Sequence, residues 1–377
     1  MLRVDLNVPI HNNEITDTTR IIKIIPTVTK LLEHKAKIIL VSHLGRPKGV
    51  LSNELSLKCV KNDLETFIKK KIFFCETNTK SIKKEDLEEK FKEYEIILLE
   101  NIRFNIEEEK NEEKFVKKLS SLAEIYINEC FSCSHRNHAS ISGIPKFLPS
   151  FPGQLLEDEI SNLKNLFYAS NHSNSIAVFG GAKISTKIKL IEFYAEKFTK
   201  ILIGGAMANT FLLSEGNEIG LSMHEKKMVK FSKEMTNRFK EKILLPLDFI
   251  VTNTTETETS IVRSKNKIKK KDTILDIGPQ TRMLFYNEIF NSDTVLWNGP
   301  LGLFEKKPFN AGTEFVLKAI RDNKNKKFFS VAGGGDTIAL LNQSDFFKNF
   351  TFVSTGGGAF LEFVQGAHMP GLASLND

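Results

Sequence analysis

The chain has few cysteines, and it lacks the marks of secreted and membrane proteins. Its 377 residues include four cysteines, Cys59, Cys75, Cys130 and Cys133, too few and too unevenly spread for a disulfide framework. No apolar run approaches the roughly 18 to 20 residues that a membrane helix needs, and the segment after Met1 does not resemble a secretory signal. We therefore expect reduced thiols, no membrane association and a cytoplasmic location.

Two common nucleotide-binding motifs are absent as well. The chain contains neither the Gly-x-x-x-x-Gly-Lys-Ser/Thr phosphate loop nor the Gly-x-Gly-x-x-Gly dinucleotide fingerprint. The missing fingerprint disfavours a dehydrogenase. The net charge of +7 resides largely in lysine runs such as residues 265–271, which are usually solvated surface, so we expect no nucleic-acid partner.

Length and composition favour a two-domain globular enzyme. A chain of 377 residues is too long for one ordinary core, and 41% hydrophobic with 26% charged residues is ordinary for such a protein. Pro145, Pro149 and Gly153 break regular structure and predict a domain boundary. A helix that joins two lobes is expected directly after them, and residues 254–271 are expected to form an exposed excursion.

Short continuous apolar runs predict strands buried on both faces. Polar stretches with helical spacing lie between them, for example residues 21–35 and 186–198. Strands that alternate with helices indicate an α/β fold with parallel sheets, which bind ligands at the carboxyl ends of their strands. The predicted strands are residues 37–41, 96–99, 125–127, 176–179, 201–203, 243–245, 294–297, 328–331 and 350–353.

The clusters that follow these strands are of two chemical kinds. The guanidinium group of an arginine can donate two hydrogen bonds to a phosphate or carboxylate. Glycine instead lets the main chain approach a phosphate closely. The first half therefore suggests an anion site and the second a nucleotide site. Clusters with Arg and His occupy residues 3–7, 42–46, 100–103 and 134–136, and glycine clusters occupy residues 179–183, 203–206, 297–302, 332–336 and 354–358.

Single residues within these clusters allow simpler interpretations. Taken alone, each arginine is more often solvated surface, each glycine pair a tight turn and His43 a structural histidine. Cys130, Cys133, His135 and His138 could also be compared with a zinc site. Their short span lacks the intervening loop of zinc fingers, and strand geometry would point some of them to opposite faces, so small buried thiols are favoured.

Seven motifs, in order along the chain, resemble the phosphoglycerate kinase family. The resemblance runs from Arg3 to the end and implies two Rossmann-like lobes, each with a parallel sheet flanked by helices, joined by an interdomain helix and hinge. On this basis we assign residues 1–153 to a triose-phosphate domain, 154–170 to the helix, 171–360 to a nucleotide domain and 361–377 to a segment returning to the first domain. The motifs are residues 3–9, 42–47, 99–104, 180–187, 296–305, 333–337 and 354–359.

The resemblance implies a glycolytic phosphotransferase that acts as a monomer. The implied reaction is reversible, Mg²⁺-dependent phosphoryl transfer between 1,3-bisphosphoglycerate and ADP, giving 3-phosphoglycerate and ATP. By position, the triose ligands would be Asp5, Asn7, Arg20, His43, Arg46, Arg103 and Arg136. The nucleotide ligands would be Gly181, Lys183, Lys187, Gly205, Asn298, Pro300, Glu305, Gly334, Gly335, Asp336 and Thr337.

The resemblance also implies individual roles. Glu305 would bond the ribose and Asp336 would serve Mg²⁺, while Arg20 and Lys183 would neutralise the phosphoryl group in flight and Gly357 would offer it an amide. The presence of Arg20, Lys183 and Asp336 argues against a non-catalytic relative of the enzyme.

The chain departs from the family pattern in three places. The family's first strand begins earlier, so a short first strand is expected here. The usual Phe-Gly-Thr-Ala-His-Arg loop is Phe131-Ser-Cys-Ser-His-Arg136, which is expected to change how the loop presents Arg136. Ala206 stands where a third glycine is common.

Overall fold

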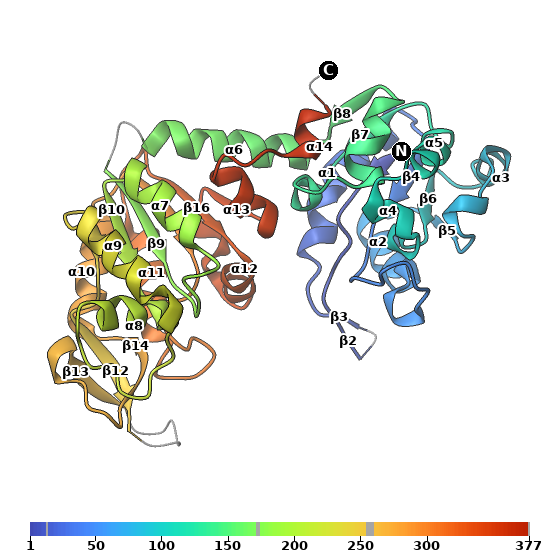
Figure 1. Ribbon diagram of the computed structural model, residues 1–377. Coiled ribbons are helices and arrows are strands. Elements are labelled where there is room, and N and C mark those ends of the chain that lie inside the picture. Colours follow the sequence, from blue (N-terminus) through green and yellow to red (C-terminus); the bar gives the residue numbers. More distant parts are fainter. Residues whose placement is uncertain (13, 171–173, 254–259, 376–377) are drawn as a thin grey trace. The chain divides into compact units, whose positions relative to one another are not determined.

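The structure consists of two compact units. The computed structural model describes residues 1–12, 14–170, 174–253 and 260–375. One unit comprises Met1–Ser161 with Gly366–Asp377, and the other comprises Asn162–Gln365 (Figure 1). The division falls inside the long helix α6 (Gln154–Ser170), the segment that the sequence assigns to an interdomain helix at residues 154–170. Within the described part of the chain, every helix is too short or too polar to span a lipid bilayer.

The first unit is built on a six-stranded parallel sheet with the order β5-β6-β4-β1-β7-β8. Its strands are β1 (Leu2–Arg3), β4 (Ile38–Val41), β5 (Ile72–Cys75), β6 (Ile96–Leu99), β7 (Tyr126–Asn128) and β8 (Ser150–Pro152), and a small hairpin pairs β2 (Ile10–His11) with β3 (Glu14–Ile15). Its helices are α1 (Thr19–Glu33), α2 (Lys61–Ile68), α3 (Lys84–Lys90), α4 (Ile106–Lys110), α5 (Glu113–Ser120) and α14 (Pro370–Ala373).

Helices cover both faces of this sheet. Alternate side chains of a strand point to opposite faces, so Ile38 and Leu40 pack in the core with α1 and α2. Their neighbours Ile39 and Val41 pack in a second core with α3 and α5. Because β4 is buried on both faces, all four of its residues are apolar.

The second unit repeats this plan with the strand order β11-β10-β9-β15-β16-β17, again all parallel. The predicted α/β fold of two parallel-sheet lobes is confirmed. The strands are β9 (Ser175–Phe179), β10 (Lys200–Ile203), β11 (Ile243–Leu244), β15 (Thr294–Asn298), β16 (Phe329–Gly333) and β17 (Phe352–Ser354). The helices are α7 (Ile188–Lys197), α8 (Gly205–Ser214), α9 (Val229–Arg238), α10 (Pro279–Phe290), α11 (Ala311–Asp322), α12 (Gly335–Asn342) and α13 (Gly358–Val364).

A small antiparallel sheet beside α8 was not predicted (Figure 1). It pairs β12 (Asp248–Thr252) with β13 (Ile261–Ser264) and β14 (Thr273–Ile277). The expected excursion at 254–271 is thus partly structured, because β13 belongs to the sheet and Ile268 is buried in its core. Residues 254–259 of that prediction lie outside the described residues.

The central strand β1 is short, and both neighbours position it. Leu2 and Arg3 pair with Leu40 and Val41 on β4 and with Ile127 and Asn128 on β7. The chain after β1 therefore emerges at the carboxyl end of the sheet, between the loops that follow β4 and β7.

Glu129, directly after β7, is a buried carboxyl group that joins three elements. It is fully buried, accepts a hydrogen bond from the Thr27 hydroxyl of α1, and accepts one from the Leu155 amide of α6 at 3.1 Å. Burial raises the pKa of Glu129 from 4.5 to about 7. Its contribution to stability is therefore fully present below pH 4.5 and is lost as the pH rises through about 7.

We expect Glu129→Gln to remove this pH dependence. Because glutamine cannot ionise, the stability of the wild type relative to the variant should fall between pH 5 and pH 8, as measured by chemical denaturation. Exposed Glu93 offers a matched control, since Glu93→Gln should keep a constant difference from the wild type. A constant difference for Glu129→Gln would contradict the assignment.

Candidate functional site

The first polar cluster gathers around Asp5, just beyond β1. Arg20 of α1 places Nη1 3.1 Å from Asp5 Oδ2, and the same nitrogen donates to the Asn7 carbonyl at 2.6 Å. The Asn7 side-chain oxygen accepts from the Gly45 amide at 2.8 Å. Residues from β1, α1 and the loop after β4 thus meet at one edge of the sheet.

Two further predicted residues, His43 and Arg103, are buried beside this cluster. His43 Nδ1 lies 3.2 Å from Arg3 Nη2, and Arg103 Nη1 donates to the Gly45 carbonyl at 3.0 Å. Burial lowers the pKa of Arg103. Arg103 therefore holds the loop at Gly45, while His43 connects the same loop to Arg3 of β1.

The remaining two arginines of the predicted anion site are placed differently. Arg46 and Arg136 are exposed, and neither forms an ion pair with a carboxylate among the residues that the structure describes. Their exposed guanidinium groups are therefore accessible to an anionic ligand.

Ser132 joins the Asp5 cluster although no motif predicted it. Its hydroxyl donates to Asp5 Oδ2. The sequence marked this position only as a departure from a familiar loop. Asp5 is therefore held by Arg20 on one side and by the loop after β7 on the other.

In the second unit, the side chain of Lys187 bonds to both the loop after β9 and the loop after β15. Its ammonium group donates to the carbonyls of Gly180 at 2.6 Å and Asn298 at 2.9 Å. Burial lowers the pKa of Lys187 to about 8, and the charge of Asp336 partly offsets this. The predicted nucleotide ligand Lys187 is thus bound to the main chain in this structure.

Side chains of the neighbouring loops complete the same network. Asn298 Nδ2 donates to the Gly333 carbonyl at 2.7 Å, and Thr337 Oγ1 accepts from the Gly299 amide at 2.8 Å. The loops after β9, β15 and β16 are consequently fixed relative to one another at the carboxyl end of the sheet.

A cavity of about 530 Å³ opens at this end of the second sheet. It brings together several predicted nucleotide ligands with an apolar wall that the sequence did not reveal. The predicted residues that line it are Gly181, Gly205, Pro300, Glu305 and Asp336, and the apolar wall includes Leu221, Met223, Phe249, Ile274 and Phe304. Such a mixture of apolar wall and few polar groups is typical of small-molecule sites.

Two glycines at this site occupy positions where a side chain would not fit. Gly334, the residue before α12, has φ +101°, and a Cβ there would lie 2.6 Å from Asn298 Nδ2. Gly205 has φ +64°, and its Cβ would lie 2.6 Å from the Gly181 amide nitrogen. Both need left-handed backbone and close approach, which only glycine tolerates well.

Asp336 is the residue best placed to hold a metal ion. It is exposed in the first turn of α12 and lines the cavity. Among the described residues, no group of three or more His, Cys, Asp or Glu side chains could hold a metal on its own. A single carboxylate suits Mg²⁺, which usually takes one or two carboxylates together with substrate phosphates and water.

The predicted catalytic residues of this unit, Lys183 and Gly357, follow β9 and β17. Lys183 is exposed in the loop after β9. Gly357 follows β17 and has φ +54° at the residue before α13. Gly335 begins α12 and is exposed.

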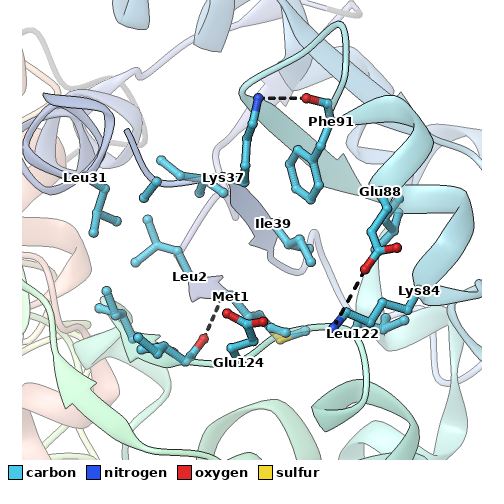
Figure 2. A pocket seen from close by; sticks show the side chains of 16 residues that line it. Met1, Leu2, Leu31, Lys37, Ile39, Lys84, Glu88, Phe91, Leu122 and Glu124 are labelled. Atoms are coloured by element: carbon cyan, nitrogen blue, oxygen red, sulfur yellow. Dashed lines mark hydrogen bonds and ion pairs between the residues drawn. The ribbon is translucent and has the colours of Figure 1, made fainter. Parts of the chain in front are cut away.

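A second cavity, of about 450 Å³, lies in the first unit away from these clusters. Figure 2 shows Leu2, Leu31, Ile39 and Phe91 around it. It is lined by residues at the amino-terminal ends of β4 and β7, opposite the strand ends that carry Asp5 and His43. The cavity is therefore separate from the polar cluster.

Comparison with known proteins identifies the family of the chain. The family model described as phosphoglycerate kinase matches residues 1–367. The chain belongs to the phosphoglycerate kinase family. It is 41% identical to the phosphoglycerate kinase of Orientia tsutsugamushi (strain Ikeda), over 100% of this chain and 93% of that protein. It is 44% identical to the enzyme of Wolbachia pipientis wMel, over 100% and 95%.

Solved structures of phosphoglycerate kinases share the fold. The structure from Coxiella burnetii has a TM-score of 0.88 and 32% identity, covering 99% of this chain and 95% of that chain. The structure from Pyrococcus horikoshii OT3 has a TM-score of 0.85 and 30% identity, with the same coverage. The chain is therefore a phosphotransferase of glycolysis.

We expect Gly334→Ala to weaken nucleotide binding, because the added methyl group would strain the backbone and push Asn298 away from the loop. Dissociation constants for MgADP from calorimetry should rise about tenfold, which corresponds to ~1.4 kcal/mol. Gly216→Ala is the matched control, since Gly216 has φ +84° but open space around its Cβ position. Equal affinities in the two variants would refute this role of Gly334.

Proposed function

We propose that the chain transfers a phosphoryl group between 1,3-bisphosphoglycerate and ADP by binding the triose on the first unit and the nucleotide on the second. The observation that carries this assignment is the cavity of the second unit, which is lined by Gly181, Gly205, Pro300, Glu305 and Asp336. Its main-chain amides suit phosphates, and its apolar wall suits the flat face of a base.

The first unit supplies charge for the anionic triose. Exposed Arg46 and Arg136 can each form two hydrogen bonds to phosphate or carboxylate oxygens. Arg20 remains partly exposed, with 31% of its side-chain surface accessible, so its guanidinium can contact a ligand while Asp5 fixes its orientation. Arg103 and Asn7 both bond Gly45 in the loop that carries Arg46, and His43 of that loop contacts Arg3.

The second unit holds the nucleotide mainly through main-chain groups. Gly334, Gly335 and Thr337 form the start of α12, whose free amides favour a phosphate. Glu305 lines the cavity where it can accept hydrogen bonds from ribose hydroxyl groups. Lys187 and Asn298 hold these loops together through hydrogen bonds to their main-chain carbonyls.

Asp336 would hold Mg²⁺ together with the nucleotide phosphates. The ion would neutralise phosphate charge and orient the phosphates for transfer. This proposal for Mg²⁺ is supported by the carboxylate of Asp336, which is exposed and lines the cavity.

The transfer itself needs position and charge and no general base. The leaving carboxylate of an acyl phosphate requires no proton, and the attacking ADP oxygen is already ionised near neutral pH. Lys183 and Arg20 would neutralise charge on the phosphoryl oxygens, and Gly357 would offer an amide to the same group. Preorganised donors of this kind account for much of the rate in phosphoryl transfer.

We expect Lys183→Ala to lower kcat by about 10² to 10³-fold, because one preorganised positive charge would be lost from the transition state. A coupled assay with 3-phosphoglycerate, MgATP and a dehydrogenase measures this. Lys189→Ala is the matched control, since Lys189 is exposed on the neighbouring helix α7 and should leave kcat unchanged. Unchanged turnover in Lys183→Ala would contradict the proposed role.

Because the two ligand sets lie on different units, transfer requires the units to close around both substrates and exclude water. Helix α6 runs across the division between the units, so a change at its ends could act as the hinge. Small-angle scattering should show a smaller radius of gyration with both substrates bound than with either alone. No compaction would count against closure.

We further propose that the enzyme works as a monomer in the cytoplasm, without nucleic-acid or membrane partners. The family supports a role in glycolysis, and the small number of cysteines is compatible with a reducing compartment.

A further inference from the structure

The turn after β7 contains two buried cysteines that the proposed reaction does not use. Cys130 and Cys133 stand three residues apart, and Cys133 ends the short 3-10 turn Phe131–Cys133. The Cys-x-x-Cys spacing in an α/β protein is typical of dithiol redox pairs. Among the described residues these thiols belong to no metal-binding group.

The backbone of this turn is suited to a disulfide. The Cys133 amide donates to the Cys130 carbonyl at 3.1 Å, which closes a four-residue turn. In such turns the first and fourth Cα atoms are less than about 7 Å apart, and disulfides join Cα atoms roughly 4.4 to 6.8 Å apart. Side-chain rotation can therefore bring the sulfurs into bonding distance without unfolding the loop.

The two thiols differ in reactivity. A hydrogen bond from Cys130, and then the electrostatic effects of His43 and Arg3, hold the pKa of Cys133 well below its usual value. Its sulfur lies 4.0 Å from both ring nitrogens of His43. Burial instead raises the pKa of Cys130. The Cys133 thiol therefore ionises more readily than the Cys130 thiol, which suits Cys133 to attack an oxidant first and Cys130 to resolve the intermediate.

Access to this pair is limited to small oxidants. Cys133 keeps 4% of its surface exposed, while Cys130 keeps none. A peroxide is small enough to approach a residue this deeply buried, whereas a bulky disulfide reagent is not. The other thiols are not activated in this way, because burial raises the pKa of both Cys59 and Cys75.

The pair is connected to the triose cluster through Ser132. Cys130 Sγ lies 3.4 Å from Ser132 Oγ, and the Ser132 hydroxyl donates to Asp5. Asp5 in turn pairs with Arg20. Drawing the two sulfurs together would move Ser132 and disturb the position of Arg20, and it would also remove the Cys133 contact with His43.

We propose that Cys130 and Cys133 form a reversible disulfide, made by a peroxide, that weakens triose-phosphate binding on the first unit. The regulatory part of this inference rests on the proposed function, whereas formation of the disulfide does not.

The oxidation has two balanced steps. The Cys133 thiolate attacks one peroxide oxygen, so that an S–O bond forms, the O–O bond breaks and hydroxide leaves. The Cys130 sulfur then attacks the Cys133 sulfur as its proton is lost, the S–O bond breaks and water leaves. Both sulfurs are oxidised, and hydrogen peroxide is reduced to water. A dithiol reductant reverses the reaction by thiol–disulfide exchange.

The test uses the full chain with Cys59→Ala and Cys75→Ala, so that only the pair remains. Hydrogen peroxide is added, removed with catalase, and the denatured protein is treated with maleimide. Intact mass and peptide mapping should show both thiols blocked by a Cys130–Cys133 disulfide that dithiothreitol reopens. The KM for 3-phosphoglycerate should rise about tenfold or more on oxidation and recover on reduction, while the KM for MgATP stays constant.

Cys130→Ala and Cys130→Ser are the matched variants that cannot close the bond. Peroxide should leave them with a sulfenic or more oxidised Cys133 and no disulfide. Thiols that remain reactive, or a disulfide that leaves the KM for 3-phosphoglycerate unchanged, would overturn the inference. A reduced enzyme without turnover would instead refute the proposed function, because the mass measurement does not depend on activity.

Discussion

Burial of each parallel sheet on both faces is the constraint on which the rest of this structure depends. Alternate residues of β4 enter opposite cores, so the strand has no free face for a polar side chain. Polar residues can therefore gather only where strands end. Because all strands of a sheet run in the same direction, their carboxyl ends meet at one edge. Asp5 and His43 reach that edge in the first unit, and Asn298 reaches the corresponding edge in the second.

The two units use this edge in different ways. In the first, side chains fix other side chains: Asp5 orients Arg20 at 3.1 Å, and Ser132 supports Asp5 from the neighbouring loop. In the second, side chains fix the main chain, as when Lys187 binds the carbonyls of Gly180 and Asn298. The arginine cluster of the first unit suits an anionic ligand, which it can bind by electrostatic attraction. A site of positioned amides suits a nucleotide whose phosphates approach the backbone.

The loop after β7 connects the triose cluster to the buried cysteine pair. The chain is 41% identical to a relative from Orientia tsutsugamushi over its whole length, and its fold superposes on a solved family structure with a TM-score of 0.88. On this frame, Ser132 adds a hydroxyl bond to Asp5 and Cys133 lies 4.0 Å from His43. Both residues lie beyond Asn128, the last residue of β7.

The sequence by itself determined the fold class, most buried strands and the two kinds of strand-end cluster, because hydrophobic periodicity and motif order are local properties. The run at residues 96–99 is the strand β6 as predicted. Tertiary structure alone decided the small sheet of β12–β14, since β13 is short, half exposed and stabilised by partners distant in the chain. Two further features also depend on tertiary structure. Leu221 and Met223 line the apolar wall of the cavity in the second unit, and the Ser132 hydroxyl donates a hydrogen bond to Asp5. These contacts join residues far apart in sequence, and no local pattern specifies which distant side chains packing will bring together.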